Sequence, residues 1–149
     1  MRAVVQRVER ASVTIEGKVS SKIGRGFLIL LGINENDTQK DAEYLATKCC
    51  GMRIFEDSEG KMNLSVKEIG GSFLVVSNFT LYGDCKKGNR PSFVQAARPE
   101  KAEELYKKFI SCIQESDIAC ETGTFGANMK VELVNDGPIT IIVESVWKK

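Results

Sequence analysis

Two unbroken apolar runs restrict the fold of this 149-residue chain more than any other feature of its sequence. They lie within residues 27–33 and 72–76, and closely spaced glycines precede each of these segments. A strand with one face in water alternates apolar and polar residues, whereas a strand that is buried on both faces does not. Both runs are therefore predicted to be buried strands.

Alternating residues predict further strands on either side of these two runs. Residues 2–8 and 11–15 alternate, and a turn at Glu16-Gly17 is expected to lead into a strand over residues 18–23. A second hairpin is predicted where residues 57–60 connect residues 52–56 with residues 61–66. Residues 129–134 and 139–146 alternate as well, and a final strand is expected to reach Trp147.

End signals and periodicity predict two helices. The first begins after Asp37 or Thr38, with Asp41 as a weak capping-box partner, and ends at Gly51. The second begins near Pro99. Its buried face is expected to consist of Ala102, Leu105, Tyr106, Phe109, Ile110 and Ile113. Many strands and two helices predict an α+β fold, in which residues 1–149 form a single domain and both helices pack on a curved, barrel-like, mainly antiparallel sheet.

Composition excludes several classes of protein. With 21 basic and 20 acidic residues the net charge is +1, so an anionic partner has to be bound by a local patch. No apolar run approaches the roughly 20 residues of a membrane helix, and no signal peptide is recognisable. Five cysteines without C-x-x-C spacing indicate reduced thiols in the cytoplasm. The absence of histidine removes histidine–metal sites and histidine-activated nucleophiles, and no metal site is predicted.

Three segments carry residue types that suit a ligand site, and each has a structural alternative. Ser77-Asn78-Phe79-Thr80 ends a buried strand, where hydroxyls, an amide and backbone N–H groups could bind an oxyanion or merely satisfy the strand end. Lys86, Lys87 and Arg90 could bind phosphates or form a solvated charged loop. Residues 124–127 surround Phe125 with small residues, which suits a pocket wall as well as core packing.

The segment Asn135–Thr140 places a Gly-Pro pair between two strand-like patterns. Asn-Asp-Gly is typical of a tight hairpin turn, but Pro138 has no N–H to donate to a neighbouring strand. An X–Pro bond is also the only place where a cis peptide has a low free-energy cost. The residues leave two alternatives: a hairpin with a rigid corner, or a turn that holds the carbonyls of Gly137 and Pro138 in an unusual direction.

Four stretches of the chain together resemble the D-aminoacyl-tRNA deacylases. They are residues 1–8, 77–81, 88–93 and 135–140, and they occur in the family's order over essentially the whole chain. The resemblance implies a homodimer without metal or other cofactor that hydrolyses the ester between a D-amino acid, or glycine, and the terminal adenosine of tRNA. The alternative is a non-catalytic RNA- or nucleotide-binding dimeric module that uses the loop from Lys86 to Arg90, and a purely structural β-dimer is a weaker third possibility.

The resemblance also implies how D- and L-substrates are distinguished. The active site would lie at the subunit interface, and Gly137 and Pro138, joined by a cis bond, would reach into the partner's pocket. Their carbonyls would face the substrate's α-amino group, where an L side chain would clash. Arg7 matches a family arginine that supports this loop.

The catalytic residues implied by the resemblance are Ser77, Asn78, Phe79 and Thr80. In the family, this motif binds the ester and the adenosine, and the RNA's own 2′-hydroxyl is thought to assist hydrolysis. Thr80 is therefore expected to position the substrate first and to act as a nucleophile second. Asn78 stands where the family usually has glutamine, which is one methylene longer. Phe125 is expected to contact the substrate, and the loop cations are expected to contact the RNA.

Overall fold

The two apolar runs form buried strands, as predicted, and these two strands are neighbours in the sheet. In the computed structural model, which describes residues 1–145, they are β3 (Gly26–Gly32) and β6 (Ser72–Ser77). The two strands are parallel, and their register places Phe27 opposite Phe73 and Leu31 opposite Ser77. Alternate side chains enter two separate hydrophobic clusters, a larger one on the helix side and a smaller one on the other side. A core on each face explains why residues 27–33 and 73–76 contain no polar side chain.

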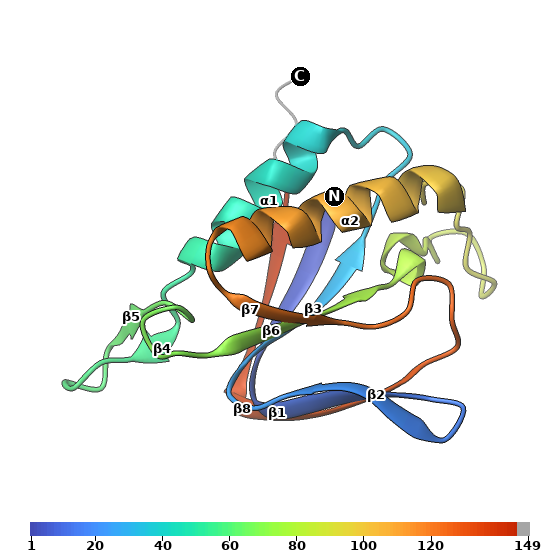
Figure 1. The fold of residues 1–149 in the computed structure, drawn as a ribbon. Coiled ribbons are helices and arrows are strands. Elements are labelled where there is room, and N and C mark those ends of the chain that lie inside the picture. Colours follow the sequence, from blue (N-terminus) through green and yellow to red (C-terminus); the bar gives the residue numbers. More distant parts are fainter. Residues whose placement is uncertain (146–149) are drawn as a thin grey trace.

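The remaining strands complete a strongly curved sheet (Figure 1). They are β1 (Arg2–Ile15), β2 (Lys18–Ile23), β7 (Ala119–Thr122) and β8 (Lys130–Glu144). The order is β2-β1-β3-β6-β7, with β8 paired to β1. β1 is antiparallel to β2, β3 and β8, whereas β6 is parallel to β3 and β7. Figure 1 shows β1 and β8 bending together below β6 and β7, which confirms the curved, mainly antiparallel sheet.

Helical connections account for the parallel pairs, because parallel strands need a crossover. The first crossover contains α1 (Gln39–Gly51) and the predicted hairpin of β4 (Phe55–Glu56) and β5 (Met62–Leu64). The second contains the short helix η1 (Phe79–Tyr82) and α2 (Pro99–Glu115). Both long helices cover the same face of the sheet (Figure 1). Neither of them, nor any helix within residues 1–145, is long and apolar enough to cross a membrane.

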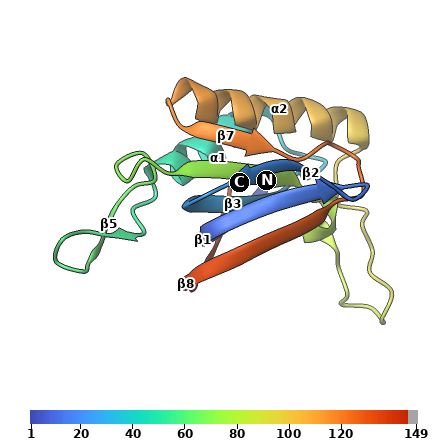
Figure 2. The same cartoon turned by 60° about the horizontal axis from the view of Figure 1, so that its bottom comes forward.

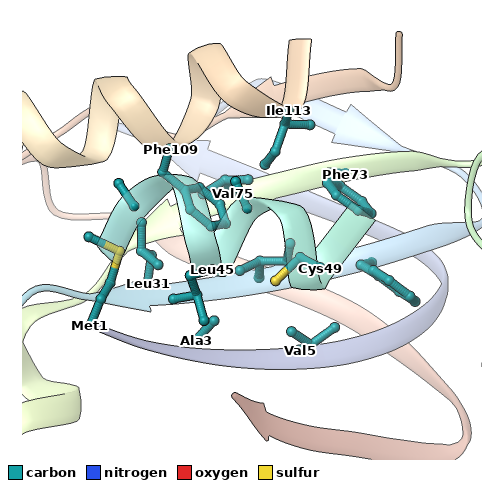
Figure 3. Packing of buried hydrophobic residues seen from close by; sticks show 14 of the residues in the cluster. Met1, Ala3, Val5, Leu31, Leu45, Cys49, Phe73, Val75, Phe109 and Ile113 are labelled. Atoms are coloured by element: carbon teal, nitrogen blue, oxygen red, sulfur yellow. The ribbon is translucent and has the colours of Figure 1, made fainter. Parts of the chain in front are cut away.

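The larger cluster lies between the helices and the sheet (Figure 3). Leu45 and Cys49 of α1 and Phe109 and Ile113 of α2 are buried in it. The predicted caps are present, because Thr38 and Asp41 form the capping box of α1 and Pro99 is the first residue of α2. Local signals thus placed both helices correctly, with Ile110 only half-buried where full burial was expected.

The hairpin alternative for Asn135–Thr140 is wrong. β8 is continuous, because its two alternating halves pair with β1 and not with each other. Gln6 lies opposite Thr140 and Val8 opposite Asn135, so two steps along β1 correspond to five along β8. The three extra residues form a bulge in the strand. The predicted continuation of this strand to Val146 and Trp147 lies outside the described residues.

Residues 2–8 and 11–15 are likewise one strand and not two. β1 pairs with β3 through residues 2–8 and with β2 through residues 11–15, while β8 follows its other edge along most of its length. Figure 2 shows two projections at opposite ends of the molecule, the β4–β5 hairpin and the loop that follows η1. The second of these carries the predicted RNA-binding cations.

Candidate functional site

A cavity of about 700 Å³ opens beside the end of β6. It unites two of the segments singled out in the sequence, residues 77–79 and residues 125–127. The lining residues are Leu30, Ile33, Val76, Ser77, Asn78, Phe79, Phe93, Ala96, Ala97, Arg98, Pro99, Ala102, Phe125, Gly126, Ala127, Asn128, Met129 and Val131. Apolar walls with a few polar groups at one end are typical of a site that encloses a small organic ligand.

The polar end of the cavity is built by the exit of the chain from β6. Asn78 donates its backbone N–H to the carbonyl of Leu31 at 2.8 Å, which continues the β3–β6 ladder by one residue. The chain then tightens into η1, for which Asn78 is the N-cap. The Thr80 hydroxyl donates to Oδ1 of Asn78. Thr80 is exposed and is not among the lining residues, so it is connected to the cavity through Asn78.

The shorter side chain at position 78 therefore has a defined partner. Its carbonyl oxygen accepts the Thr80 hydroxyl, and the amide nitrogen remains available as a donor to a ligand. Within residues 1–145, the backbone N–H groups of Phe79 and Thr80 make no hydrogen bond. Two unpaired main-chain donors next to an amide donor form an arrangement that can stabilise negative charge on an ester oxygen.

Aromatic rings flank this polar end. Phe79 is 56% exposed and meets Phe93 edge to face, with ring centroids 5.2 Å apart and an interplanar angle of 73°. Phe125 also lines the cavity and contacts Tyr106 of α2, with ring centroids 5.8 Å apart. Tyr106 is fixed by a 3.0 Å hydrogen bond from its hydroxyl to the carbonyl of Val75. The wall formed by Phe125 is thus anchored to the core.

Arg7 is buried, with 4% of its surface exposed, and it ties the bulge of β8 to the β4–β5 hairpin. Its guanidinium donates to the carbonyl of Ile54 at 2.8 Å, to the carbonyl of Asp136 at 3.1 Å and to the carboxylate of Glu56 at 3.0 Å. The hydrogen bond from Arg7 holds the pKa of Glu56 below its usual value. Asp136 precedes Gly137, so Arg7 fixes the backbone where the bulge begins.

Gly137 and Pro138 are exposed and joined by a cis peptide bond. Within one chain they do not line the cavity beside Ser77. On β3, the residue opposite Arg7 is Phe27 and the residue opposite Ser77 is Leu31. Four residues of strand span about 13 Å. The two motifs named by the family resemblance therefore lie at different ends of the sheet in a single protomer.

The predicted cations lie on the exposed loop after η1. Two backbone hydrogen bonds between Asp84 and Ser92, of 2.8 and 2.9 Å, close the base of this loop. Lys86, Lys87 and Arg90 are exposed and, within residues 1–145, form no salt bridge. A smaller cavity of about 440 Å³, lined by Arg2, Tyr82, Gly83, Asp84, Cys85, Lys86 and Gln95, lies beside the loop. The three cations do not line the larger cavity, but Phe93, which follows the base of the loop directly, does.

The cavity offers hydrogen bonding and positioning more than a side-chain nucleophile. None of the cysteines lines it, and burial raises the pKa of both Cys49 and Cys120 to about 12, so these thiols stay protonated at neutral pH. No described lining residue carries a carboxylate. Within residues 1–145, no three side chains of the His, Cys, Asp and Glu types cluster so that they could hold a metal ion.

Some of the cavity's residues were missed by the sequence analysis. Phe93, Arg98 and Asn128 all line it. The only sequence signal for Arg98 was its position before Pro99. Pro99 predicted where α2 starts, but not that this start lies beside the cavity. Phe93 and Asn128 lie in loops, whose positions depend on tertiary contacts.

Comparisons with known proteins agree with the resemblance found in the sequence. A family described as D-Tyr-tRNA(Tyr) deacylase matches residues 4–144. D-aminoacyl-tRNA deacylases from Koribacter versatilis (strain Ellin345) and Thermotoga petrophila are 60% and 55% identical over 145 residues, which is 97% of this chain and 97% of each relative.

Solved structures show the same fold. The c-Myc DNA Unwinding Element Binding Protein superposes with a TM-score of 0.92 at 44% identity, over 99% of this chain and 100% of that chain. A probable eukaryotic D-amino acid tRNA deacylase shares the fold at 18% identity, with a TM-score of 0.80 over 96% and 98% of the two chains. Because the family match and the curated relatives extend over nearly the whole sequence, the chain belongs to the D-Tyr-tRNA(Tyr) deacylase family.

Proposed function

We propose that the protein hydrolyses the ester bond of D-aminoacyl-tRNA and releases a free D-amino acid and tRNA. The observation that carries this proposal is the cavity beside Ser77, in a chain that belongs to a deacylase family. The terminal adenosine enters between the apolar walls, and the ester lies at the polar end beside Asn78. The tRNA chain leaves the cavity toward the loop that carries Lys86, Lys87 and Arg90, where its phosphates meet cations.

Hydrolysis in this site needs positioning and charge stabilisation. Water attacks the carbonyl carbon, the bond to the ribose oxygen breaks, and that oxygen receives a proton. The backbone N–H groups of Phe79 and Thr80 and the amide of Asn78 donate to the developing oxyanion. The 2′-hydroxyl of the ribose assists the attack, as the family resemblance implies, so no histidine is needed.

The selectivity step uses a second copy of the chain. Gly137 and Pro138 of one protomer enter the cavity of its partner in a homodimer, and their carbonyls face the substrate's α-amino group. An L side chain clashes there, whereas D side chains and glycine do not, so glycyl-tRNA mischarged on tRNA(Ala) is also a substrate. Two observations support this arrangement: the bulge is exposed and distant from its own cavity, and Ile142, on the same strand, is 65% exposed.

The direct test is release of tyrosine from D-Tyr-tRNA and from L-Tyr-tRNA by the purified protein, in the presence of a chelator. We expect turnover of the D-ester and little turnover of the L-ester. If neither ester is hydrolysed but tRNA binds, the protein is a non-catalytic RNA-binding module. If both esters are hydrolysed equally, the selectivity step is wrong.

Replacing Thr80 by valine should lower kcat about 10- to 100-fold without abolishing turnover. Valine matches threonine in shape but cannot donate to Oδ1 of Asn78, so the Asn78 amide loses its orientation. Single-turnover kinetics with D-Tyr-tRNA measures the effect. Thr80→Ser is the matched control, because it keeps the hydroxyl and should stay close to wild type. Complete loss in Thr80→Val with an intact fold would instead indicate a covalent nucleophile.

Replacing Gly137 by alanine should abolish most D-selective turnover, and the loss should be complementable in a mixed dimer. Gly137 has a φ of 136°, and an added Cβ would lie 2.7 Å from Cγ1 of Ile139. A heterodimer of Gly137→Ala and Thr80→Val contains one site with two intact parts out of two sites, so the heterodimer isolated from co-expressed, differently tagged chains should recover about half of wild-type activity. Recovery no better than the sum of the two separate variants would place both motifs in one protomer.

Neutralising Lys86, Lys87 and Arg90 with glutamine should weaken tRNA binding and flatten its salt dependence. Three lost contacts to single-stranded phosphates reduce the slope of log affinity against log salt by about 2. Filter binding between low and moderate salt measures this slope. The matched variant neutralises Arg10, Lys18 and Lys22, three exposed cations on β1 and β2. Equal slopes in both variants would show that the phosphates are held elsewhere.

A further inference from the structure

Arg98 is the only charged residue among the described residues that line the large cavity. The other seventeen are apolar, small or uncharged polar residues, including the Ser77 and Asn78 that form the polar end. Arg98 is exposed, and within residues 1–145 it forms no salt bridge. The proposed reaction does not use it. A lone, exposed and uncompensated cation in the wall of an apolar cavity requires an explanation.

The backbone of Arg98 is fixed while its side chain is free. Ala97 is buried and donates its N–H to the carbonyl of Ile33 at 2.9 Å, which attaches this segment to the chain that follows β3. Arg98 is the N-cap of α2, and its carbonyl accepts the N–H of Ala102 at 2.9 Å. Arg98 is thus anchored at the wall of the cavity, and its guanidinium keeps all its donors for a ligand.

The proposed substrate presents one anionic group at this place. A terminal adenosine whose ribose carries the amino acid is joined to the rest of the tRNA through a single 5′-phosphodiester. If the nucleoside occupies the apolar cavity, this phosphate lies where the chain leaves it. An ionised phosphate beside apolar walls is unfavourable without a counter-charge. A guanidinium binds two phosphate oxygens at once, and Arg98 is the cation placed to do so.

We propose that Arg98 binds the phosphate that joins the terminal adenosine to the preceding nucleotide. This inference rests on the proposed function and adds to it a contact that orients the nucleoside in the cavity. Arg98 is then a positioning residue for the reaction. The loop with Lys86, Lys87 and Arg90 binds phosphates farther along the chain, so the two sets of cations are separable by experiment.

The test uses two minimal substrates, D-tyrosyl esters of adenosine with and without a 5′-phosphate. For the wild-type protein, we expect KM to be about fivefold lower for the phosphorylated substrate, the upper range for an exposed charge pair. Arg98→Gln should remove this preference and leave KM for the unphosphorylated ester unchanged. Arg98→Lys should retain part of the preference, since it keeps the charge but not the fork. Lys40→Gln, which removes an exposed cation at the start of α1, should leave the preference unchanged.

Several results would overturn the inference. The first is a wild-type protein that shows no preference for the phosphorylated ester. The second is an Arg98→Gln variant that keeps the preference. The third is an Arg98→Gln variant in which KM rises by the same factor for both esters. If the wild-type protein hydrolyses neither minimal ester, turnover of D-Tyr-tRNA decides on the proposed function, and calorimetry with adenosine 5′-monophosphate and adenosine decides on the phosphate contact. Tighter binding of the monophosphate that disappears in Arg98→Gln supports the phosphate contact, and equal binding of the two ligands overturns it.

Discussion

Replacing Arg7 by alanine should lower the free energy of unfolding by about 2–4 kcal/mol and remove most turnover of D-aminoacyl-tRNA. The guanidinium is buried and holds the carbonyls of Ile54 and Asp136 and the carboxylate of Glu56. Without it, two carbonyl oxygens lose their donor, and the backbone before Gly137 loses its attachment to the β4–β5 hairpin. Denaturant unfolding measures the first effect, and D-Tyr-tRNA hydrolysis measures the second.

A neighbouring arginine provides the control for this prediction. Arg10 lies on the same strand, but its side chain is 67% exposed and, among residues 1–145, pairs only with the adjacent Glu9. Arg10→Ala should therefore change the free energy of unfolding by less than about 0.5 kcal/mol. Arg7→Lys should be intermediate, because one ammonium group cannot reach all three acceptors. An Arg7→Ala variant as stable and active as Arg10→Ala would show that the bulge does not need this anchor.

Replacing Gly26 by alanine should prevent folding or cost about 4 kcal/mol or more. Gly26 has a φ of 157°, and an added Cβ would lie 1.8 Å from the carbonyl oxygen of Ser72. These two residues begin the parallel pairing of β3 with β6, so the clash has to separate the strands at the centre of the sheet. Thermal and denaturant unfolding of the purified variant measure the loss.

Gly24 is the matched control, two residues earlier in the same segment. A Cβ added there meets no heavy atom within 4 Å. Gly24→Ala should fold normally and should have a free energy of unfolding within about 1 kcal/mol of wild type. If Gly26→Ala were equally harmless, the close approach of β3 and β6 at this position would be wrong.

The parts of the fold that were predicted correctly depend on signals within short segments. The unbroken apolar run of residues 27–33 could only be a buried element, and Thr38, Asp41 and Pro99 mark helix starts by interactions with their own neighbours. The β4–β5 hairpin follows from the turn residues between its strands. Such interactions are local, so a sequence pattern specifies them.

The parts that were wrong or missing depend on distant partners. Asn-Asp-Gly suits a hairpin, but the residues on both sides of it pair with β1, more than a hundred residues earlier in the chain. The same side chain that suits a turn, Asn135, instead spans the bulge, because its amide donates to the carbonyls of Arg7 and Ile139 at 2.9 Å each. No local sequence pattern specifies that both halves of β8 pair with β1, or that β3 pairs in parallel with β6.

In the candidate site, too, residue type indicated some of the residues, whereas only tertiary packing places the others. Ser77, Asn78, Phe79 and Phe125 were singled out by residue type and meet in one cavity. Their proposed roles, and those of Thr80, Gly137 and Pro138, come from the family resemblance and stay predictions. Arg98 escaped notice because a lone arginine before a helix has no distinctive pattern, and only the packing of α2 places it at the cavity.

The bulge in β8 falls where this strand passes from one hydrophobic cluster to the other. Before it, Val131 and Leu133 pack against the smaller cluster, and after it, Ile139, Ile141 and Val143 pack against the larger one. The Gly137–Pro138 segment therefore spans the junction of two separately packed cores. Its position therefore depends on how those cores pack against each other. Through the proposed selectivity step, we expect substitutions deep in either core to change which substrates the enzyme accepts.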